Sequence, residues 1–399
     1  MDFDPTSPAV KANPYPAYAQ LRETAPIAWN EAGFWTIARN EDCLKLLRDK
    51  RMGKAHPFAW EADHPNLPLV AVHKAMMIFQ DGSPHLRLRR LFTSVFTRKA
   101  VEDLRPGIAA MTDSLLDDLR GRDEVDIVSE FCFPITLGTI CQMLGVPESD
   151  IDYCYRLMST VQRLHEHDLT DAELQLISDN TVELAGYFAE HVQDRKKNPK
   201  DDLITLLVQA EVDGEQLSEE EIVANAILMY LGGEDTNAYL MANSTLALLS
   251  SPDQADVLRN DQEVVETTAF EEMLRFDSSI QMMPRHVFED VDYGGVTFEA
   301  GQTVMCLLGS ANRDGLEYEN PDVIDLRRQV KRGVGFGGGP HLCLGAPLAR
   351  VQLREALPRL FRTFPEMALA SSELEYELLV VRGPKELRLS LGRDHQLTA

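Results

Sequence analysis

The stretch GVGFGGGPHLCLGAPLAR, residues 333–350, surrounds a single cysteine, Cys343, with glycines and runs into a helical pattern. Gly333, Gly335 and Gly338 have the G-x-G-x-x-G spacing of a dinucleotide-binding loop. Such a loop requires a hydrophobic strand before it and a helix that opens directly from it. Here the preceding residues are LRRQVKR and Pro340 interrupts the segment after the glycines, so the context excludes the nucleotide interpretation.

The glycines of this stretch allow backbone N–H groups to approach the Cys343 sulfur, and the predicted helix starts beside it. A helix N-terminus stabilises a thiolate, so we expect Cys343 to be deprotonated and able to ligate a soft metal. No second Cys or His stands at zinc spacing, so the thiolate would be an axial ligand to a metal that a cofactor holds otherwise. Haem meets this requirement, because thiolate ligation of haem iron favours O–O cleavage.

An acid and a hydroxyl, Asp235 and Thr236, follow the glycine pair Gly232 and Gly233 in an otherwise apolar helical pattern. Each glycine costs about 1 kcal/mol relative to alanine in a helix interior, so the pair indicates a kink or a flat group against the backbone. A buried carboxylate is costly unless it is paired or functional. A plain kink, with Thr236 hydrogen-bonded to the preceding turn, is the alternative, and the residues alone leave both interpretations open.

Basic residues are clustered in this chain, although its formal net charge is −25. Two basic islands contain no acid, one between Gly82 and Val101 and one between Leu326 and Arg354. Their cations are Arg87, Arg89, Arg90, Arg98 and Lys99 in the first, and Arg327, Arg328, Lys331, Arg332, Arg350 and Arg354 in the second. The acidic balance disfavours nucleic acid and membranes as partners, whereas the islands indicate an anionic ligand or an acidic protein. Solvated runs of charge are the alternative.

Helical patterns dominate residues 85–275 and must position these groups. The clearest helix begins at Ser218, where Glu221 completes a capping box, and ends at Ser251. It would be roughly 48 Å long and, being apolar on nearly every side, would run through the middle of the protein. Strand-like alternation appears later, in 286–308 and 376–391.

Bulk features of the 399-residue chain favour a cytoplasmic protein of one domain, residues 1–399. We find no internal repeat, linker, secretory signal or apolar run long enough to span a membrane. The cysteines are scattered without a C-x-x-C pair, which is typical of a reducing compartment. They are Cys43, Cys132, Cys141, Cys154, Cys306 and Cys343, and we expect most of them to be buried.

The ten residues FGGGPHLCLG, Phe336 to Gly345, match the haem-thiolate signature F-G-x-G-x-H-x-C-x-G at every fixed position. On this match the chain resembles the cytochrome P-450 superfamily, in its soluble bacterial type. DGSPHLRLRRLFTSVF, GGEDT, EEMLR and ANRDGLEYENPDVIDLRR are similar to further family segments in the same order, so the resemblance covers nearly the whole chain. It implies a mainly α fold with small β-sheets, a single domain with a long central helix over the haem, and no fused reductase.

The resemblance implies a role for individual residues around haem b. Cys343 would be the axial iron ligand, Phe336 would shield its sulfur, and Gly345, Gly232 and Gly233 would adjoin the cofactor. The haem propionates would contact His85, Arg89, Arg285 and His341. Thr236 would stabilise the oxygen being reduced while Asp235 passes protons inward. Glu272, Arg275 and Arg328 would form a structural triad that takes no part in the chemistry.

The family positions of the substrate pocket correspond to Met229, Ile280, Met282, Met283, Val380 and Val381. Met suits irregular apolar ligands, but each of these residues could equally fill the core. We therefore expect a medium-sized apolar substrate, such as a steroid, terpenoid, fatty acid or macrolide. Two departures from the family pattern, Gly232 in place of Ala and Asn237 in place of a second Thr, leave the acid–hydroxyl pair intact.

The implied activity is monooxygenation: one oxygen atom from dioxygen enters the substrate as a hydroxyl or epoxide. Electrons would come from a ferredoxin or flavodoxin with its NAD(P)H-dependent reductase, docked near Arg89, Arg90, Lys331, Arg332 and Arg350. A peroxide-driven peroxygenase or a thiolate-haem isomerase is the enzymatic alternative, and Asp235-Thr236 argues against both because neither needs a proton relay. A haem-based sensor or carrier would normally bring a signalling module, which the chain lacks.

Overall fold

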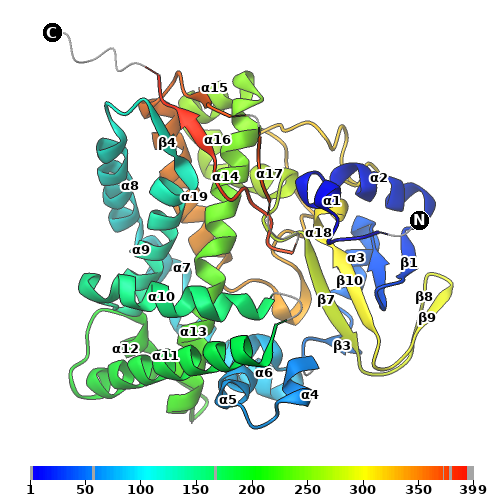
Figure 1. The fold of residues 1–399 in the computed structure, drawn as a ribbon, viewed down its shortest axis with the longest axis vertical. Helices are drawn as coiled ribbons and strands as arrows, with labels where there is room; N and C mark the ends of the chain where they lie inside the picture. The colour runs from blue at the N-terminus through cyan, green and yellow to red at the C-terminus, as the bar shows by residue number, and fades with distance from the viewer. Residues whose placement is uncertain (1–2, 56–58, 166–168, 372, 377–379, 393–399) are drawn as a thin grey trace. The chain divides into compact units, whose positions relative to one another are not determined.

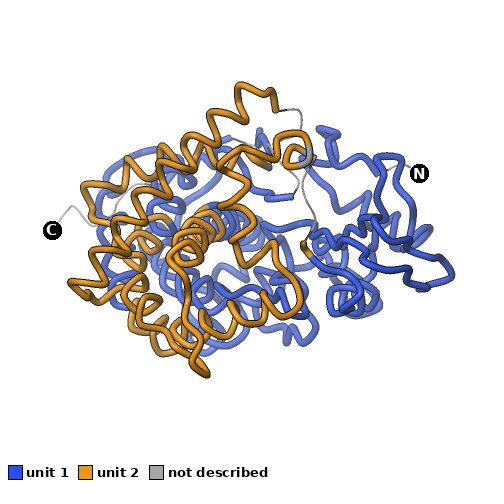
Figure 2. Tube along the Cα trace, turned by 90° about the horizontal axis from the view of Figure 1, so that it is seen from below, with its two compact units in different colours: residues 1–53, 105–136, 235–399 blue, residues 54–104, 137–234 orange. Residues whose placement is uncertain are grey.

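The computed structural model describes residues 3–55, 59–165, 169–371, 373–376 and 380–392. The chain groups into two compact units (Figure 2). Unit 1 comprises residues 1–53, 105–136 and 235–399, and unit 2 comprises residues 54–104 and 137–234. The prediction of a single domain over residues 1–399 stays a prediction.

Unit 1 contains helices that pack around α19, the helix that begins just after the cysteine stretch (Figure 1). Its helices are α1 (Pro8–Ala12), α2 (Tyr15–Thr24), α3 (Asn40–Leu46), α8 (Arg105–Leu119), α14 (Asp235–Leu249), α15 (Pro252–Asn260), α16 (Gln262–Thr267), α17 (Ala269–Phe276), α18 (Leu308–Ala311) and α19 (Ala346–Thr363), with the short turns η2 (Val128–Cys132) and η5 (Gly339–His341). Helices α8, α14, α15 and α17 all contact α19, so the segment after Cys343 is held from several sides.

The largest sheet of unit 1 has the strand order β1-β2-β10-β7-β3. These strands are β1 (Ile27–Asn30), β2 (Phe34–Ile37), β3 (Met52–Gly53), β7 (Met282–Val287) and β10 (Thr303–Leu307); only β2 and β10 pair in parallel. The smaller sheets are β4 (Glu124–Asp126) with β11 (Ala368–Leu369) and β12 (Arg388–Ser390), and β8 (Val291–Tyr293) with β9 (Val296–Phe298).

Alternation along β10 gives the five-stranded sheet two different apolar faces. Val304 and Cys306 belong to a core cluster with Ile37 and Val334, whereas Leu307 belongs to another cluster with Tyr18. Successive side chains of a strand point to opposite faces, so the same division applies to the paired strand β7. The sheet therefore separates α1 and α2 from the loop that precedes Cys343, which shares its core cluster with α3.

Unit 2 is helical apart from one small hairpin. Its elements are α4 (Ala59–Asp63), α5 (Pro68–Ala75), η1 (Met77–Phe79), α6 (Gly82–Val95), α7 (Arg98–Glu102), η3 (Glu148–Asp150), α10 (Ile151–Gln162), η4 (Arg163–His165), α11 (Asp171–Lys197), α12 (Leu203–Gln209), β5 (Glu211–Val212), β6 (Glu215–Gln216) and α13 (Glu219–Gly233). Helix α9 (Phe133–Leu144) begins in unit 1 and continues in unit 2. Within unit 2, the long helix α11 packs against α5, α10, α12 and α13.

The predicted helix from Ser218 to Ser251 is present but is not continuous. Its capping box is confirmed, since the Ser218 Oγ accepts from the Glu221 N–H and the Glu221 carboxylate accepts from the Ser218 N–H. α13 ends at Gly233, Glu234 departs from helical geometry with a ψ of −77°, and α14 begins at Asp235. The interruption directly after Gly233 agrees with the kink that the glycine pair indicated, and it divides the long helix expected from the sequence into α13 and α14.

The fold class expected from the sequence, mainly α with small β-sheets, is confirmed. Strands also appear throughout 286–308 as predicted, whereas 376–391 forms only β12 and isolated bridges among the residues described there. Residues 377–379 of that stretch lie outside the described residues. Among the described helices, none is both long and apolar enough to cross a membrane.

Candidate active site

The loop before α19 forms a close-fitting backbone cradle around Cys343. The Cys343 N–H donates to the Phe336 carbonyl (3.1 Å), and the Leu342 N–H donates to the Gly339 carbonyl (3.1 Å). Gly337 and Gly339 have φ values of +71° and +70°, a region that residues with a Cβ rarely adopt. A Cβ on Gly337 would also lie 3.1 Å from the Met283 sulfur. The glycines are thus required by the turn itself and by its close packing.

Cys343 differs from every other cysteine of the chain, all of which lie in the described part: it is exposed, whereas the other cysteines are buried. Burial raises the pKa of Cys141 to about 12 and that of Cys154 to about 11, and it also raises the pKa of Cys43 and Cys132. These thiols therefore stay protonated at neutral pH. Cys343 is therefore the one cysteine whose thiol is exposed to solvent.

Helix α19 begins immediately after the cysteine, as the sequence predicts. Gly345 is its N-cap, and the helix runs from Ala346 to Thr363. A Cβ on Gly345 would lie 3.8 Å from the Cys343 sulfur, so the thiol lies beside the helix N-terminus. The first N–H groups of a helix have no intrahelical acceptor and carry partial positive charge. This end of α19 therefore favours a thiolate at Cys343.

Phe336 is held by Phe270, which the sequence analysis did not assign, and by Arg350, which it assigned to the docking of an electron donor. Its ring stacks on that of Phe270, with centroids 5.8 Å apart and planes 12° apart. The Arg350 guanidinium lies 4.9 Å from the Phe336 centroid, while its Nε donates to Glu271 at 2.5 Å. This sandwich links α17 and α19 to the loop before Cys343. The only signal in the sequence for this contact is the position of Arg350 in the predicted helix, seven residues after the cysteine.

Arg285 joins β7 to the same loop. Its side chain is only 1% exposed, and its guanidinium donates to the carbonyls of Pro284 (3.0 Å) and Gly338 (3.3 Å). His341, in η5, is half-buried. Both predicted propionate contacts in unit 1 thus belong to or adjoin the segment 338–341. The guanidinium of Arg285 thus brings a positive charge to the loop before Cys343.

The helix break brings a different set of groups together. Gly232 is exposed, and a Cβ there would meet no described atom within 4 Å. At Gly233 a Cβ would collide with the Ile140 side chain, so this glycine is required by packing. Glu234 is buried, and Asp235 and Thr236 form the half-buried first turn of α14. The carboxyl of Asp235 and the hydroxyl of Thr236 therefore lie at a helix N-terminus. The sequence analysis had placed them inside a helix.

A hydrogen bond that the sequence analysis missed connects α14 to α19. The Asn237 Nδ2 donates to the Gln352 Oε1 at 2.6 Å, with both side chains buried. The bond joins the residue after Thr236 to the helix that starts beside Cys343. Because neither amide has an obvious role in its own helix, the pair fixes the position of the acid–hydroxyl turn relative to the cysteine helix. Asn237 had been noted only as a departure from the family pattern.

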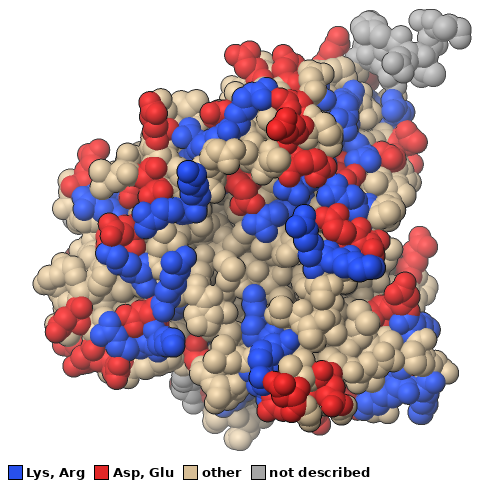
Figure 3. Space-filling view, turned by 180° about the vertical axis from the view of Figure 1, so that it is seen from behind, with Lys and Arg blue, Asp and Glu red and all other residues tan. Residues whose placement is uncertain are grey.

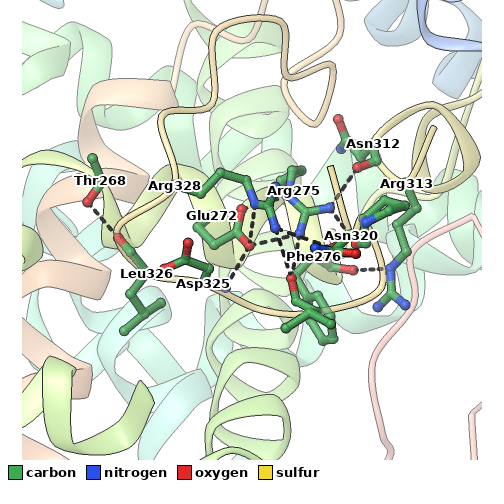
Figure 4. A network of polar contacts seen from close by, with 12 residues as sticks. Thr268, Glu272, Arg275, Phe276, Asn312, Arg313, Asn320, Asp325, Leu326 and Arg328 are labelled. Carbon is green, nitrogen blue, oxygen red and sulfur yellow. Dashed lines mark hydrogen bonds and ion pairs between the residues drawn. The ribbon is translucent and has the colours of Figure 1, made fainter. Parts of the chain in front are cut away.

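The predicted triad is brought together in unit 1 (Figure 4). The Arg275 Nε and Nη2 donate to the two carboxylate oxygens of Glu272, at 2.6 Å and 2.8 Å, and the Arg328 Nε donates to Glu272 at 3.2 Å. Arg275 also donates to the carbonyls of Asn312 and Pro321. Glu272 and Arg275 are at most 1% exposed. The geometry is that of a buried link between α17 and the loop that leads to Cys343.

The predicted pocket residues of unit 1 do not all lie on one face. Ile280 and Val381 pair in an antiparallel bridge, and Val380 is 41% exposed. Ile280 and Met283 pack against the same core cluster. Met282 is directed to the opposite face of β7, where it is 4% exposed in the cluster with Tyr18. Met282 therefore fills the core, which is the alternative that the sequence left open for it.

The remaining predicted residues lie in unit 2. His85 and Arg89 are four residues apart on α6, so they share one face of that helix. His85 is 2% exposed and Arg89 is half-buried. Met229 is half-buried in the last turns of α13, one turn before Gly233. The cofactor and pocket roles of these three residues stay predictions.

The basic islands contain no acid in sequence, yet much of their charge is paired in space. In unit 2, Arg87 pairs with Glu221, and Arg90 pairs with Asp213 and Glu215; in unit 1, Arg327 pairs with Asp261, Arg332 with Glu317 and Arg350 with Glu271. Figure 3 shows Lys and Arg interspersed with Asp and Glu on one face. Lys331 is exposed and makes no ion pair with a described residue.

These observations test whether the residues fit the expected haem. Within unit 1, the exposed thiol of Cys343, the glycine cradle around it and the cation Arg285 bonded to the same loop are each what a carboxylate-bearing, thiolate-ligated group requires. No cluster of three or more His, Cys, Asp or Glu among the described residues could hold a metal ion. A metal at Cys343 would thus have to be carried by a cofactor. The residues fit the group.

Comparison with known proteins gives concordant matches. The family model described as cytochrome P-450 matches residues 53–389. A vitamin D(3) 25-hydroxylase of Pseudonocardia autotrophica is 38% identical over 392 residues, covering 95% of this chain and 94% of the relative. An epothilone C/D epoxidase of Sorangium cellulosum is 33% identical, covering 92% and 90%. A Bacillus megaterium cytochrome P-450 solved with testosterone has a TM-score of 0.85 at 30% identity and covers 95% and 99%.

Proposed function

The chain belongs to the cytochrome P-450 family of haem-dependent monooxygenases, and from this premise we propose that Cys343 is the axial thiolate ligand of its haem b. The observation that carries the proposal is the exposed sulfur of Cys343 in a glycine cradle, while every other cysteine is buried. A bound haem would supply the iron at which dioxygen is activated, and a thiolate ligand on that iron favours O–O cleavage. Cys343 contributes the negative charge, and the N-terminus of α19 stabilises that charge before and during the reaction.

Asp235 and Thr236 are assigned to proton delivery. Cleavage of dioxygen consumes protons, and an apolar pocket supplies none. In the first turn of α14 the Thr236 hydroxyl can donate toward the oxygen being reduced, and the Asp235 carboxyl can restore that proton from solvent. The Asn237–Gln352 hydrogen bond supports this assignment, because it ties the turn to α19 and limits its movement.

The proposed substrate is a medium-sized apolar molecule. In unit 1 the side chains of Ile280, Met283 and Val381 offer apolar contact and no charge, and Met adapts to irregular shapes. The relatives are named for vitamin D(3) and epothilone, and the related structure contains testosterone. Hydroxylation or epoxidation of a molecule of this class is therefore the reaction we assign to the chain.

Electrons are assigned to a separate ferredoxin or flavodoxin with its NAD(P)H-dependent reductase. Bacterial members of the family typically use such partners. Lys331 and Arg332 lie shortly before the cysteine loop and are exposed, so an acidic donor could meet positive charge there. Arg332 is partly neutralised by Glu317, which makes Lys331 the stronger candidate.

The experiment is a two-step assay of the haem-loaded protein. Apolar compounds are first screened for a substrate-induced change of the haem spin state, and the best binder is then turned over with a ferredoxin system under isotope-labelled dioxygen. The proposal predicts a product that carries one labelled oxygen atom. A product formed from hydrogen peroxide alone, with none from dioxygen and electrons, would contradict it and favour a peroxygenase.

A further inference from the structure

A buried ion pair, Asp277 with Arg382, joins the two segments of unit 1 that carry the proposed pocket residues Ile280 and Val381. The Arg382 Nη1 donates to both carboxylate oxygens of Asp277, at 3.0 Å each. The Arg382 side chain is 4% exposed and that of Asp277 is 14% exposed. The two residues are 105 positions apart in the chain, and neither belongs to a motif that the sequence analysis singled out.

The same pair holds the N-terminal helices. The Arg382 Nε donates to the Lys11 carbonyl (3.2 Å) and its Nη2 donates to the Ala12 carbonyl (2.8 Å), at the end of α1. The Tyr15 hydroxyl donates to the Asp277 Oδ1 at 2.6 Å, at the start of α2. Every nitrogen of the Arg382 guanidinium is therefore engaged, two of them with backbone carbonyls that have no charge of their own.

The pair also stands at the end of a short antiparallel ladder. The Arg382 N–H donates to the Ser279 carbonyl (2.6 Å), and the Gln281 N–H donates to the Val380 carbonyl (3.1 Å). Between these two bonds lies the bridge of Ile280 with Val381. The ladder consists of these few contacts alone among the residues described there, so its register depends on the groups that anchor its ends.

Helix α14 also contacts the backbone of the two residues that form the ion pair. The Asn243 Nδ2 donates to the Arg382 carbonyl at 3.0 Å and to the Asp277 carbonyl at 3.4 Å. A Cβ on Gly383 would collide with the Tyr239 ring, so the chain after Arg382 lies directly against α14. A shift of the ion pair would therefore move the ladder against the helix that begins with Asp235 and Thr236.

We propose that Asp277 and Arg382, with Tyr15, are positioning residues that fix the Ile280–Val381 ladder and thereby determine which ligands the pocket accepts. The inference rests on the proposed function, in which Ile280 and Val381 line the substrate pocket. The ion pair does not touch the substrate. It acts by holding two short segments and the N-terminal helices in one arrangement.

The test compares Asp277→Asn, Arg382→Lys and Tyr15→Phe with Glu355→Gln in the haem-loaded protein. Asp277→Asn keeps an acceptor for Tyr15 but removes the charge, and Arg382→Lys keeps the charge but removes the fork. Glu355→Gln is the matched control, because the Glu355 side chain is also largely buried and pairs with Arg105 (2.8 Å) between α8 and α19, away from the ladder. The probes are imidazole and phenylimidazole, a small and a larger ligand, titrated by their spectral shifts.

The positioning role predicts that the ratio of the two dissociation constants changes by about fivefold or more in Asp277→Asn and Arg382→Lys, and stays at the wild-type value in Glu355→Gln. Amide hydrogen exchange at Gln281 and Arg382 should become faster in the same two variants and not in the control. If both charge variants fail to fold, Tyr15→Phe, which removes one hydroxyl, replaces them in the test. The ratio of dissociation constants should then change, and exchange at Gln281 and Arg382 should become faster, as in the charge variants.

An unchanged ratio in folded ladder variants, or an equal change in Glu355→Gln, would overturn the inference. Failure of the proposed function looks different: the wild-type protein would then show no azole spectral shift at all. In that case hydrogen exchange alone decides whether the ion pair fixes the ladder, since unchanged exchange at Gln281 and Arg382 would refute it.

Discussion

At the scale of single residues, the burial of each thiol decides which cysteine can act. A thiol binds iron as a thiolate, and burial in an apolar core raises the pKa of the thiol because it penalises the charged form. Cys141 and Cys154 illustrate this, with pKa values raised to about 12 and about 11. Cys343 is instead exposed and lies beside the N-terminus of α19, whose partial positive charge favours a thiolate.

The role of Thr236 can be tested by removing its hydroxyl. Thr236→Ala should bind substrate and accept electrons normally but divert reducing equivalents to hydrogen peroxide, because protons reach the oxygen less selectively. The quantity to measure is product formed per NAD(P)H consumed. Thr245→Ala is the control, since its hydroxyl bonds only to the Met241 carbonyl of the same helix. Full coupling in Thr236→Ala would place the relay elsewhere, for example on a substrate hydroxyl.

Asp235 makes a separate prediction at the same scale. Asp235→Asn removes the acid that resupplies the relay, so turnover should slow by about 10²-fold, within the usual range for general acid catalysis. The solvent isotope effect on turnover should increase, because proton transfer becomes more rate-limiting. A wild-type rate with an unchanged isotope effect would remove Asp235 from the mechanism.

At the scale of elements, the break at Glu234 separates two helices with different anchors. The start of α14 is tied to α19 by the buried Asn237–Gln352 bond. Asn237→Ala leaves the Gln352 amide buried without this partner, which should lower the free energy of unfolding by about 1–3 kcal/mol. Denaturant unfolding measures the loss. The control is Asn260→Ala, because the Asn260 amide is exposed and bonds within its own helix, so its removal should leave the free energy of unfolding unchanged. An equal loss of stability in both variants would contradict a stabilising role of the Asn237–Gln352 bond.

The Glu272 triad supports a second element-scale prediction. Glu272→Gln leaves the guanidinium of Arg275 buried beside a neutral amide, and breaking a buried pair in this way typically costs about 3–5 kcal/mol. Thermal unfolding should show a clearly lower midpoint. The exposed pair of Glu41 with Lys45 is the control, and Glu41→Gln should leave the midpoint where it is. A midpoint unaffected by Glu272→Gln would contradict the structural role of the triad.

The elements also show how far the sequence could lead. Local signals were sufficient for the capping box at Ser218, the start of α19 and the cradle glycines, because each depends on neighbours within a few residues. The opposite faces of Met282 and Met283 needed the register of β7 with β10. The pairs Asn237–Gln352 and Asp277–Arg382 join residues more than 100 positions apart in the chain. No local sequence pattern around these four residues predicts which residue each one contacts.

At the scale of the whole molecule, the net charge of −25 and the local cations make opposite predictions for an acidic electron donor. If overall charge governs the encounter, repulsion dominates and added salt accelerates electron delivery by screening it. If Lys331 and its neighbours form the docking point, local attraction dominates and added salt slows delivery. We expect the second outcome, with a further loss in Lys331→Glu and none in Lys385→Glu, whose lysine pairs with Glu375. A rate that rises with salt would refute local docking.

The most direct test of the account is the spectrum of the reduced, carbon-monoxide-bound protein. Wild type and Cys154→Ala should show the red-shifted Soret band of a thiolate-ligated haem, because Cys154 is a buried, protonated thiol. Cys343→Ala should lose that band while haem content is measured independently. A red-shifted band that persists in Cys343→Ala, or that disappears in Cys154→Ala at normal haem content, would contradict the assignment of Cys343 as the ligand.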